Sequence, residues 1–326
     1  MEQKTKKVLS IGSYNVGLTC RTGRIPNWGE TLIGSGFSES YGGKGSNQAV
    51  AAAKLGGEVT FVGCFGEDKY GDDGLAMLER AGVDTSYIIR TNKRVTGVGI
   101  ILLNEENDNC IIVDVGANKE LCPMYMDSIE NVISDCDIVV FQLEIPYETV
   151  RRGMEIAKRK GKMIILNPAP ARKEAMELLS LASIVNPNES ELLILNGKEP
   201  SDQLTMEECE RLARQLLTKG PEVVIVTRGE KGCFIVTSKE TVNIPAYPVK
   251  AIDTTGAGDA FTGALAVALA EGYELLEAVS FANLAGAYCV TKEEVVPAFA
   301  TREQLSQFKN NKQFADIHEG EGLFKI

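Results

Sequence analysis

The chain has 326 residues, with 34 Lys and Arg against 45 Asp and Glu and a formal net charge of −11. An acidic balance argues against a sequence-independent nucleic-acid binder or a protein of anionic membrane surfaces, because like charges repel. The single histidine, His318, cannot supply both a Ser/His/Asp triad and a metal cluster. The content of apolar residues, 44%, is typical of a soluble globular protein.

The eight cysteines are scattered and form no CxxC pair, which predicts reduced thiols, most of them in the core. The N-terminal stretch lacks the features of a signal peptide. No apolar run approaches the about 20 residues of a membrane span. We therefore expect a cytoplasmic protein with neither a nucleic-acid nor a membrane partner.

From residue 8 onward, short β-rich runs alternate with helical patterns. Strands are predicted over 8–11, 59–62, 138–141, 163–166, 184–186 and 223–226, and helices over 46–55, 72–81, 147–160 and 206–217. Continuous apolar strands separated by amphipathic helices indicate a mostly parallel sheet covered on both faces. This is an α/β architecture of the three-layer sandwich type.

Two segments, 16–41 and 96–115, break this alternation. The first contains Gly and Ser with few helix formers, and the second predicts a hairpin in which GVGIILLN and CIIVDV flank the polar EENDN. We expect both to form a small β-rich lid on a single domain of residues 1–326, since no repeat or linker divides the chain. Ordinary surface excursions are the alternative. The polar stretch 310–326 predicts a surface extension or an interface arm.

The first glycine-rich motif, residues 41–49, reads YGGKGSNQA and opens a predicted helix. Glycines let a ligand approach the main chain closely, and Asn47 offers both a donor and an acceptor to hydroxyl groups. This combination suits a sugar. The alternative is a turn before an Ala-rich core helix, with Asn47 facing solvent.

The second motif, residues 251–263, reads AIDTTGAGDAFTG and also opens a helix. Gly256 and Gly258 can turn successive N–H groups into one concavity, and the helix start adds partial positive charge, which makes an anion hole. Asp259 would lie against the bound anion, where a carboxylate is useful as a general base for a group that attacks it. The helix dipole alone also favours an acidic residue there.

Two better-known phosphate motifs do not fit. A Walker loop requires Ser or Thr after its Gly-Lys pair, whereas Gly45 follows Lys44. The dinucleotide-binding fingerprint requires a third glycine where Phe261 stands.

Together the two motifs resemble the signatures of the ribokinase-like (PfkB) carbohydrate kinases. Further landmarks follow the family's order, namely GDD at 71–73, GAN at 116–118, QLE at 142–144, NPAPA at 167–171, NESE at 188–191 and TRGEKG at 227–232. The resemblance covers nearly the whole chain. It implies a ribokinase-like fold, ATP and Mg²⁺ as cofactors, a small sugar as substrate and a homodimer formed through the lid.

The resemblance also implies a role for each matching position. In catalysis, Asp259 matches the base, and the anion hole comprises Gly256, Ala257 and Gly258. The sugar positions are Asn15, Gly42, Gly43, Lys44, Asn47 and Glu144. The nucleotide positions are Asn188, Thr227, Gly229, Gly232 and Asn283. Glu191 matches the residue that organises Mg²⁺ through water, and Asp253 with the carbonyl of Thr255 matches part of a K⁺ site.

The chain departs from this pattern at two places. Gly17 stands where the ribokinase branch has an acidic residue that reads sugar hydroxyls, and residues 290–298 lack the branch's Gly and Ser near Glu294 and Ala298. The resemblance predicts an ATP-dependent kinase that phosphorylates a primary hydroxyl of ribose or a related furanose. A nucleoside kinase with its base in the space at Gly17 is one alternative. A sugar-binding regulatory protein without catalysis is another, although the intact Asp259 argues against it.

Overall fold

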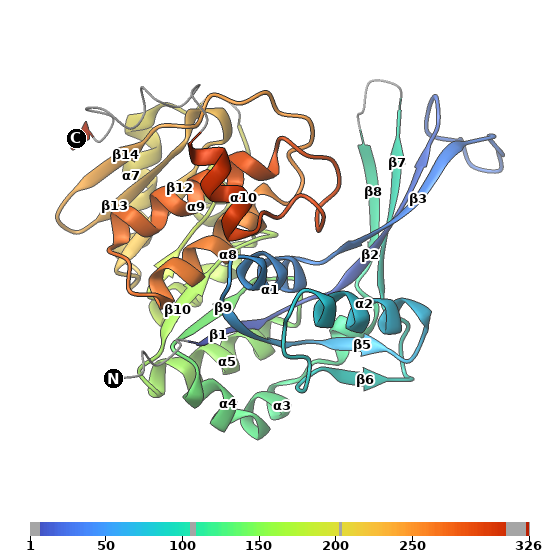
Figure 1. Ribbon diagram of the computed structural model, residues 1–326, viewed down its shortest axis with the longest axis horizontal. Coiled ribbons are helices and arrows are strands. Elements are labelled where there is room, and N and C mark those ends of the chain that lie inside the picture. The colour runs from blue at the N-terminus through green and yellow to red at the C-terminus, as the bar shows by residue number, and fades with distance from the viewer. Residues whose placement is uncertain (1–6, 105–108, 202–203, 311–323, 326) are drawn as a thin grey trace.

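The computed structural model describes residues 7–104, 109–201, 204–310 and 324–325. Among these residues, nine strands form one sheet that has helices on both faces (Figure 1). In spatial order they are β15 (Phe324–Lys325), β14 (Thr241–Ile244), β13 (Cys233–Thr237), β12 (Val223–Thr227), β11 (Ile184–Val185), β10 (Met163–Leu166), β9 (Ile138–Phe141), β1 (Lys7–Ile11) and β4 (Glu58–Val62). The strands from β12 to β4 pair in parallel, and the three beyond β12 are antiparallel. The predicted three-layer α/β sandwich with a mostly parallel sheet is confirmed.

All six strands predicted from the sequence are present, although β11 ends at Val185, one residue early. The four predicted helices are α1 (Lys44–Lys54), α2 (Lys69–Arg80), α5 (Tyr147–Arg159) and α7 (Met206–Leu217). The helix α2 begins earlier than its apolar pattern because Asp68 caps it and accepts a hydrogen bond from the Gly71 N–H at 2.9 Å. The predicted extension at 310–326 lies almost entirely outside the described residues.

The strands carry apolar side chains on both faces, and successive residues enter different cores. In β9, Ile138 and Val140 lie in one core, whereas Val139 and Phe141 lie in the other. The first core is covered by α1, α8 (Ala257–Ala270), α9 (Leu275–Cys289) and α10 (Arg302–Lys309). The second is covered by α3 (Pro123–Ser128), α4 (Glu130–Asp135), α5, α6 (Glu189–Leu195) and α7. The sheet is thus buried on both sides.

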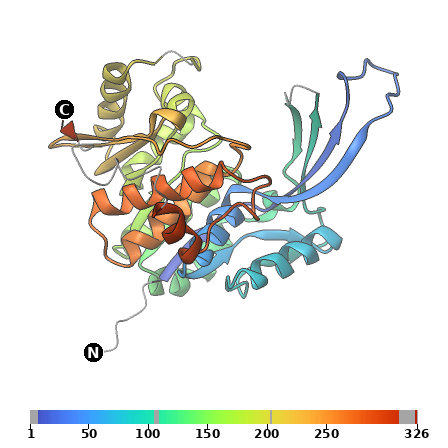
Figure 2. The ribbon, with the colours of Figure 1, turned by 45° about the horizontal axis from the view of Figure 1, so that its top comes forward.

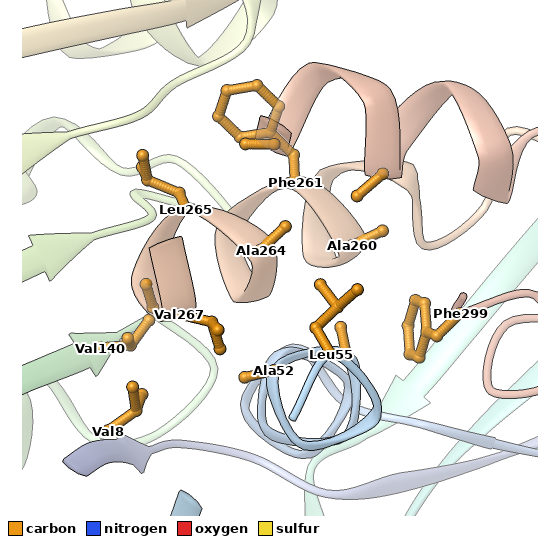
Figure 3. Close-up of a cluster of buried hydrophobic side chains, with 14 of the residues drawn as sticks. Val8, Ala52, Leu55, Val140, Ala260, Phe261, Ala264, Leu265, Val267 and Phe299 are labelled. Carbon is orange, nitrogen blue, oxygen red and sulfur yellow. The ribbon is translucent and has the colours of Figure 1, made fainter. Parts of the chain in front are cut away.

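The helices α1 and α8 pack closely against each other, and this contact positions both glycine-rich motifs. Small side chains allow the approach: Ala260 and Ala264 of α8 lie over Ala52 and Leu55 of α1 (Figure 3). At Gly263, an added Cβ would lie 2.7 Å from the carbonyl oxygen of Gln48. Any larger residue there would push the two helices apart.

A four-stranded sheet, here called the small sheet, projects away from the body (Figures 1 and 2). Its order is β3 (Ser35–Gly42), β2 (Asn15–Arg21), β7 (Gly97–Leu103) and β8 (Asn109–Asp114). The antiparallel pairing of β7 with β8 confirms the predicted hairpin, whose turn at 105–108 lies outside the described residues. The short pair β5 (Cys64–Gly66) and β6 (Ile89–Thr91) was not predicted. None of the described helices is long and apolar enough to cross a membrane.

Candidate active site

The candidate site lies at the carboxyl edge of the main sheet, where ligands of open α/β sheets bind. Four buried polar residues follow strand ends: Gln142 after β9, Asn167 after β10, Asn186 after β11 and Ser13 two residues after β1. The N-termini of α1 and α8 meet this edge from one side. The fold therefore brings both glycine-rich motifs to one place, where Asn47 of the first contacts Asp259 of the second, 212 residues further along the chain.

The start of α8 has the geometry that the second motif predicts. Gly256 is the N-cap residue with φ 80°, a left-handed conformation that glycine adopts without strain. An added Cβ at Gly256 would also lie 2.7 Å from Cγ1 of Val295. The Ala257 N–H donates a long hydrogen bond to the Thr254 carbonyl at 3.3 Å. The space beside Gly258 is open, since an added Cβ would meet no atom within 4 Å.

Asp259 is buried, at 5% exposure, and both its oxygens accept hydrogen bonds from α1. Asn47 Nδ2 donates to Oδ2 at 2.8 Å, and Gln48 Nε2 donates to Oδ1 at 2.9 Å. Burial raises the pKa of Asp259, while the Lys44 ammonium and the two amide donors oppose that rise. Asn47 is 5% exposed, so the alternative in which it faces solvent is wrong.

Lys44 lies among three carboxylates. Burial lowers the pKa of Lys44, but Asp259, Glu144 and Glu191 together raise it above its usual value. Burial also raises the pKa of Glu191, although Glu191 accepts a hydrogen bond from the Asn188 N–H. The cluster is therefore rich in negative charge before any anionic ligand enters it.

Glu144 connects β1 to the first glycine motif. Its Oε2 accepts from Ser13 Oγ at 2.5 Å and from the Lys44 N–H at 2.9 Å. The motif needs its glycines for close approach: at Gly43, with φ 91°, an added Cβ would lie 2.6 Å from Cα of Tyr14. Gly42 has more room, with the carbonyl oxygen of Asn15 at 3.5 Å.

Asn15, at the start of β2, is held by a residue for which the sequence predicted no role. Asn118 Nδ2 donates to Asn15 Oδ1 at 2.9 Å and also to the carbonyls of Tyr14 and Val115. Gly97 leaves room for this arrangement, because an added Cβ there would lie 2.1 Å from Asn15 Oδ1.

The residues predicted for the nucleotide lie farther along the same edge. Asn188 caps α6 in a capping box with Glu191, in which each side chain accepts from the backbone N–H of the other, at 2.8 and 2.9 Å. Asn188 also forms a bridge with Thr227 at the end of β12. Gly229 and Gly232 both have positive φ, 55° and 84°.

Two predicted positions have local partners. Asn283 Nδ2 donates to the Pro245 carbonyl at 2.9 Å, which ties α9 to the segment after β14. Asp253 Oδ1 accepts from the Thr255 N–H at 2.9 Å, and the Thr255 carbonyl faces Cys289 Sγ at 3.8 Å. Within the described residues, no group of three or more His, Cys, Asp and Glu side chains is placed to hold a metal ion.

Sequence reasoning missed a set of buried amides around Asp259. Gln48, Gln142, Asn167 and Asn186 all lie in segments that the sequence analysis used only as landmarks or as strand and motif ends. Each is at most 7% exposed. For Gln142, Asn167 and Asn186 the available signal was a polar side chain directly after a strand rich in apolar residues, where a buried polar group requires a partner; Gln48, inside α1, gave no such signal.

Comparison with known proteins places this geometry in context. The sequence matches the pfkB family of carbohydrate kinases over residues 5–301. It is 37% identical to a ribokinase of Haemophilus influenzae over 303 residues, which is 93% of this chain and 98% of that protein. It is 38% identical to a deoxyribokinase of Salmonella typhi over 299 residues, 91% of this chain and 97% of that protein.

Solved structures give the same result. The ribokinase of Arabidopsis thaliana complexed with ribose and ATP matches with a TM-score of 0.88 at 30% identity, covering 94% of this chain and 99% of that one. The ribokinase of Thermotoga maritima matches with a TM-score of 0.85 at 36% identity, covering 94% and 100%.

Proposed function

Because the chain belongs to the pfkB family of carbohydrate kinases, we propose that it transfers the γ-phosphoryl group of ATP to a primary hydroxyl of ribose or 2-deoxyribose. It is an ATP-dependent sugar kinase, and what is proposed is the choice of sugar and the role of each residue. The observation that carries the proposal is the buried Asp259, held by two amides at the N-terminus of α8.

Asp259 would accept the proton of the attacking hydroxyl, which then attacks the γ-phosphorus in line. The N–H groups at the start of α8, around Gly256 and Gly258, would face the negative charge that develops on the transferred group. Burial excludes water that would compete as acceptor, and by raising the pKa of Asp259 it makes the carboxylate a stronger base as long as other groups keep it ionised.

Asn47 supports a hydroxyl-bearing substrate independently of the family. Its Nδ2 is committed to Asp259, whereas its Oδ1 is buried and has no hydrogen-bond partner among the described residues. A buried acceptor without a donor is costly, and a sugar hydroxyl would supply that donor. We assign the other sugar contacts to Asn15, Gly42, Gly43, Lys44 and Glu144.

Gly17 bears on the choice of sugar. It lies in β2 on the same side as Asn15 and pairs with Ser40 and Gly99, so its backbone is extended. No carboxylate stands there to read adjacent hydroxyls, and we propose that ribose and 2-deoxyribose are discriminated weakly. Ser40 Oγ and Ile101 Cδ1 lie 2.6 and 3.3 Å from where a Cβ would be, so the space is modest and favours a free sugar over a nucleoside.

We propose Mg²⁺ as the metal that accompanies ATP. Asn188 Oδ1 and one oxygen of Glu191 are committed to the α6 capping box, which leaves the other Glu191 oxygen for a water of the hydrated ion. When bound, the ion would neutralise phosphate charge. The nucleotide itself we assign to Asn188, Thr227, Gly229, Gly232 and Asn283.

For K⁺ the candidate ligands are Asp253 and the Thr255 carbonyl. Nearby, Lys54 Nζ donates to the carbonyls of Val296 and Phe299, at 2.8 Å each. An ammonium group thus already binds carbonyls in the segment that packs on Gly256. We therefore expect K⁺ to have only a small effect on activity.

We also propose a homodimer through the small sheet, acting as a lid over the sugar. Its β7–β8 hairpin exposes apolar side chains on both faces: Ile112, at 66%, pairs with Ile100, at 47%, on one face, and Ile111, at 50%, lies on the other. A cytoplasmic location is proposed because the eight cysteines are free thiols, as expected of a reducing compartment.

An assay that couples ADP release to a detectable signal tests the function. Ribose and 2-deoxyribose should release ADP at rates far above the sugar-free blank, and the products should carry phosphate at the primary hydroxyl. Nucleosides should release little ADP above the same blank. Release with nucleosides alone would favour the nucleoside-kinase alternative, and sugar binding without ADP release would favour the regulatory one.

A further inference from the structure

A connected set of buried side chains lies beneath Asp259, where α1 and α8 meet the ends of β9, β10 and β11. Its members are Gln48, Gln142, Asn167, Asn186 and Thr262, with exposures of 1, 0, 7, 3 and 0%. Such networks are costly when partly satisfied and rigid when their bonds are made. Gln142 Oε1 and Asn186 Oδ1 have no hydrogen-bond partner among the described residues, whereas every polar atom of the Gln48 side chain and both oxygens of Asp259 are bonded.

Gln48 is fixed from both ends of its amide. Gln142 Nε2 donates to Gln48 Oε1 at 2.6 Å, and Gln48 Nε2 donates to Asp259 Oδ1 at 2.9 Å and to Asn167 Oδ1 at 3.3 Å. A primary amide has one accepting side and one donating side. Because Gln142 occupies the accepting side, the NH₂ group of Gln48 is committed to Asp259 and Asn167.

Asn167 is fixed in turn. Its Nδ2 donates to the Asn186 carbonyl at 3.2 Å, which directs its Oδ1 toward Gln48. Beyond it, Asn186 Nδ2 donates to Thr262 Oγ1 at 2.7 Å, and Thr262 Oγ1 donates to the Gly258 carbonyl at 2.8 Å. The set thus closes a loop from the side chain of Asp259 back to the residue before it in α8.

We propose that Gln48 is a positioning residue for phosphoryl transfer: its amide, oriented by Gln142, fixes Asp259 Oδ1 and keeps the carboxylate ionised for proton acceptance. This rests on Asp259 being the base of the proposed function. Asn47 holds the other oxygen, Oδ2, so the two amides together fix the plane of the carboxylate. Gln48 lies behind Asp259 as part of the buried network, and Asn47 retains an acceptor for substrate.

The charges around Asp259 show why a donor at Oδ1 matters. Glu144 and Glu191 add negative charge, and Cys289 faces Asp259 as a thiol whose pKa is raised to about 12, mainly by burial, so it stays neutral. Lys44 opposes them, but it faces all three carboxylates at once. Burial favours the protonated, inactive form of Asp259, and the hydrogen bond from Gln48 favours the ionised one.

The test is the pH dependence of kcat/KM with ribose and saturating ATP for the wild type and Gln48→Met, which keeps the volume but removes the donor. Without the donor, the pKa of Asp259 rises, so the acid limb should move to higher pH by about one unit. The control is Asn186→Leu, which removes the bond to Thr262 and touches neither Asp259 nor Gln48. It should lower Tm and leave the acid limb in place.

Gln142→Met provides a second route if Gln48→Met does not fold. It leaves the Gln48 amide present but frees it to rotate, so the acid limb should move in the same direction by a smaller amount. If the acid limb of Gln48→Met stays at the wild-type pH, the proposal is wrong, even if this variant is less stable. If only Gln142→Met folds, an acid limb at the wild-type pH in that variant would overturn the proposal instead. If the wild type phosphorylates no sugar, the proposed function itself fails.

Discussion

Asp259 combines burial with two amide donors, and this environment decides what its replacement by Asn would do. An Asn side chain keeps the shape but turns one oxygen into an NH₂ group, which must then face either Asn47 Nδ2 or Gln48 Nε2. We expect Asp259→Asn to lower kcat by at least about 10²-fold, since the base is lost, while ATP binding stays close to wild type. Steady-state kinetics and calorimetric titration with ATP measure both.

The matched control is Asp253→Asn, in the same motif but outside the network around Asp259. Its Oδ1 accepts a bond from the Thr255 N–H, which the Asn oxygen can still accept. Its kcat should fall far less. Retention of most activity in Asp259→Asn would remove this residue from the role of base.

A substitution at Gly17 can test how the protein chooses between ribose and 2-deoxyribose. Since Gly17 lies in an extended strand, Gly17→Asp requires only that Ser40 Oγ move from 2.6 Å and that Ile101 shift slightly. The new carboxylate could accept bonds from adjacent ring hydroxyls. We expect selection for ribose over 2-deoxyribose to sharpen by about 1.5–3 kcal/mol, the range for a hydrogen bond to a charged group.

Gly17→Asn separates charge from bulk in this experiment. It introduces nearly the same volume without the charge, so it should sharpen the kcat/KM ratio less than Gly17→Asp does. An equal ratio in the wild type and both folded variants would mean that position 17 does not read the sugar, leaving Asn15, Asn47 and Glu144 to do so.

Site residues that lie within one short sequence motif could be predicted from the sequence. Gly256 and Asp259 belong to one short motif, so their proximity follows from chain connectivity. Gln48 and Gln142 lie 94 residues apart, and both partners are neutral amides that also occur as surface residues. Their pairing depends on how α1 lies over β9, and no local pattern encodes that placement.

At the scale of elements, α1, α2, α5 and α7 were predicted from their apolar periodicity and α8 from the glycine-rich motif that opens it, whereas α9 was not predicted. The helix α7 was predicted with its observed ends, because it buries one face and exposes the other. The helix α9 has apolar and small residues around most of its circumference, packed against α8, so it lacks a contrast with a period of 3.6. The antiparallel strands β13 and β14 were likewise not predicted from their short apolar runs.

The segment between α9 and α10 contains a backbone feature that a single substitution can test. Glu294 has φ 63°, the left-handed conformation that costs a non-glycine residue about 1–2 kcal/mol. Its side chain is exposed. We expect Glu294→Gly to increase the free energy of unfolding by up to about 1 kcal/mol, because relief of strain outweighs the greater flexibility of the unfolded chain. Chemical denaturation measures the difference.

The neighbouring residue supplies the control for this prediction. Glu293 is also exposed but has no positive φ, so Glu293→Gly gains no relief of strain and should lower the free energy of unfolding. Equal destabilisation by the two substitutions would show that the backbone at Glu294 stores no strain.

At the scale of the whole molecule, the small sheet differs from the body. The body buries apolar side chains on both faces of its main sheet, whereas the small sheet leaves Ile111, Ile112 and Val113 at 50, 66 and 54% exposure. A net charge of −11 opposes association between copies of the chain, so an association would depend on this exposed apolar surface. Adjacent apolar side chains on a projecting sheet are typical of an interaction surface.

The double variant Ile111→Lys/Ile112→Lys tests the proposed homodimer, because adjacent residues of one strand point to opposite faces and both faces of the β7–β8 hairpin then carry charge. We expect the wild type to elute as a dimer in light-scattering chromatography and the double variant as a monomer, since a buried unpaired charge is strongly unfavourable. Met124→Lys, at a residue of α3 that is 75% exposed and far from the small sheet, should remain dimeric. A monomeric wild type, or a double variant that stays dimeric, would exclude this surface as the interface.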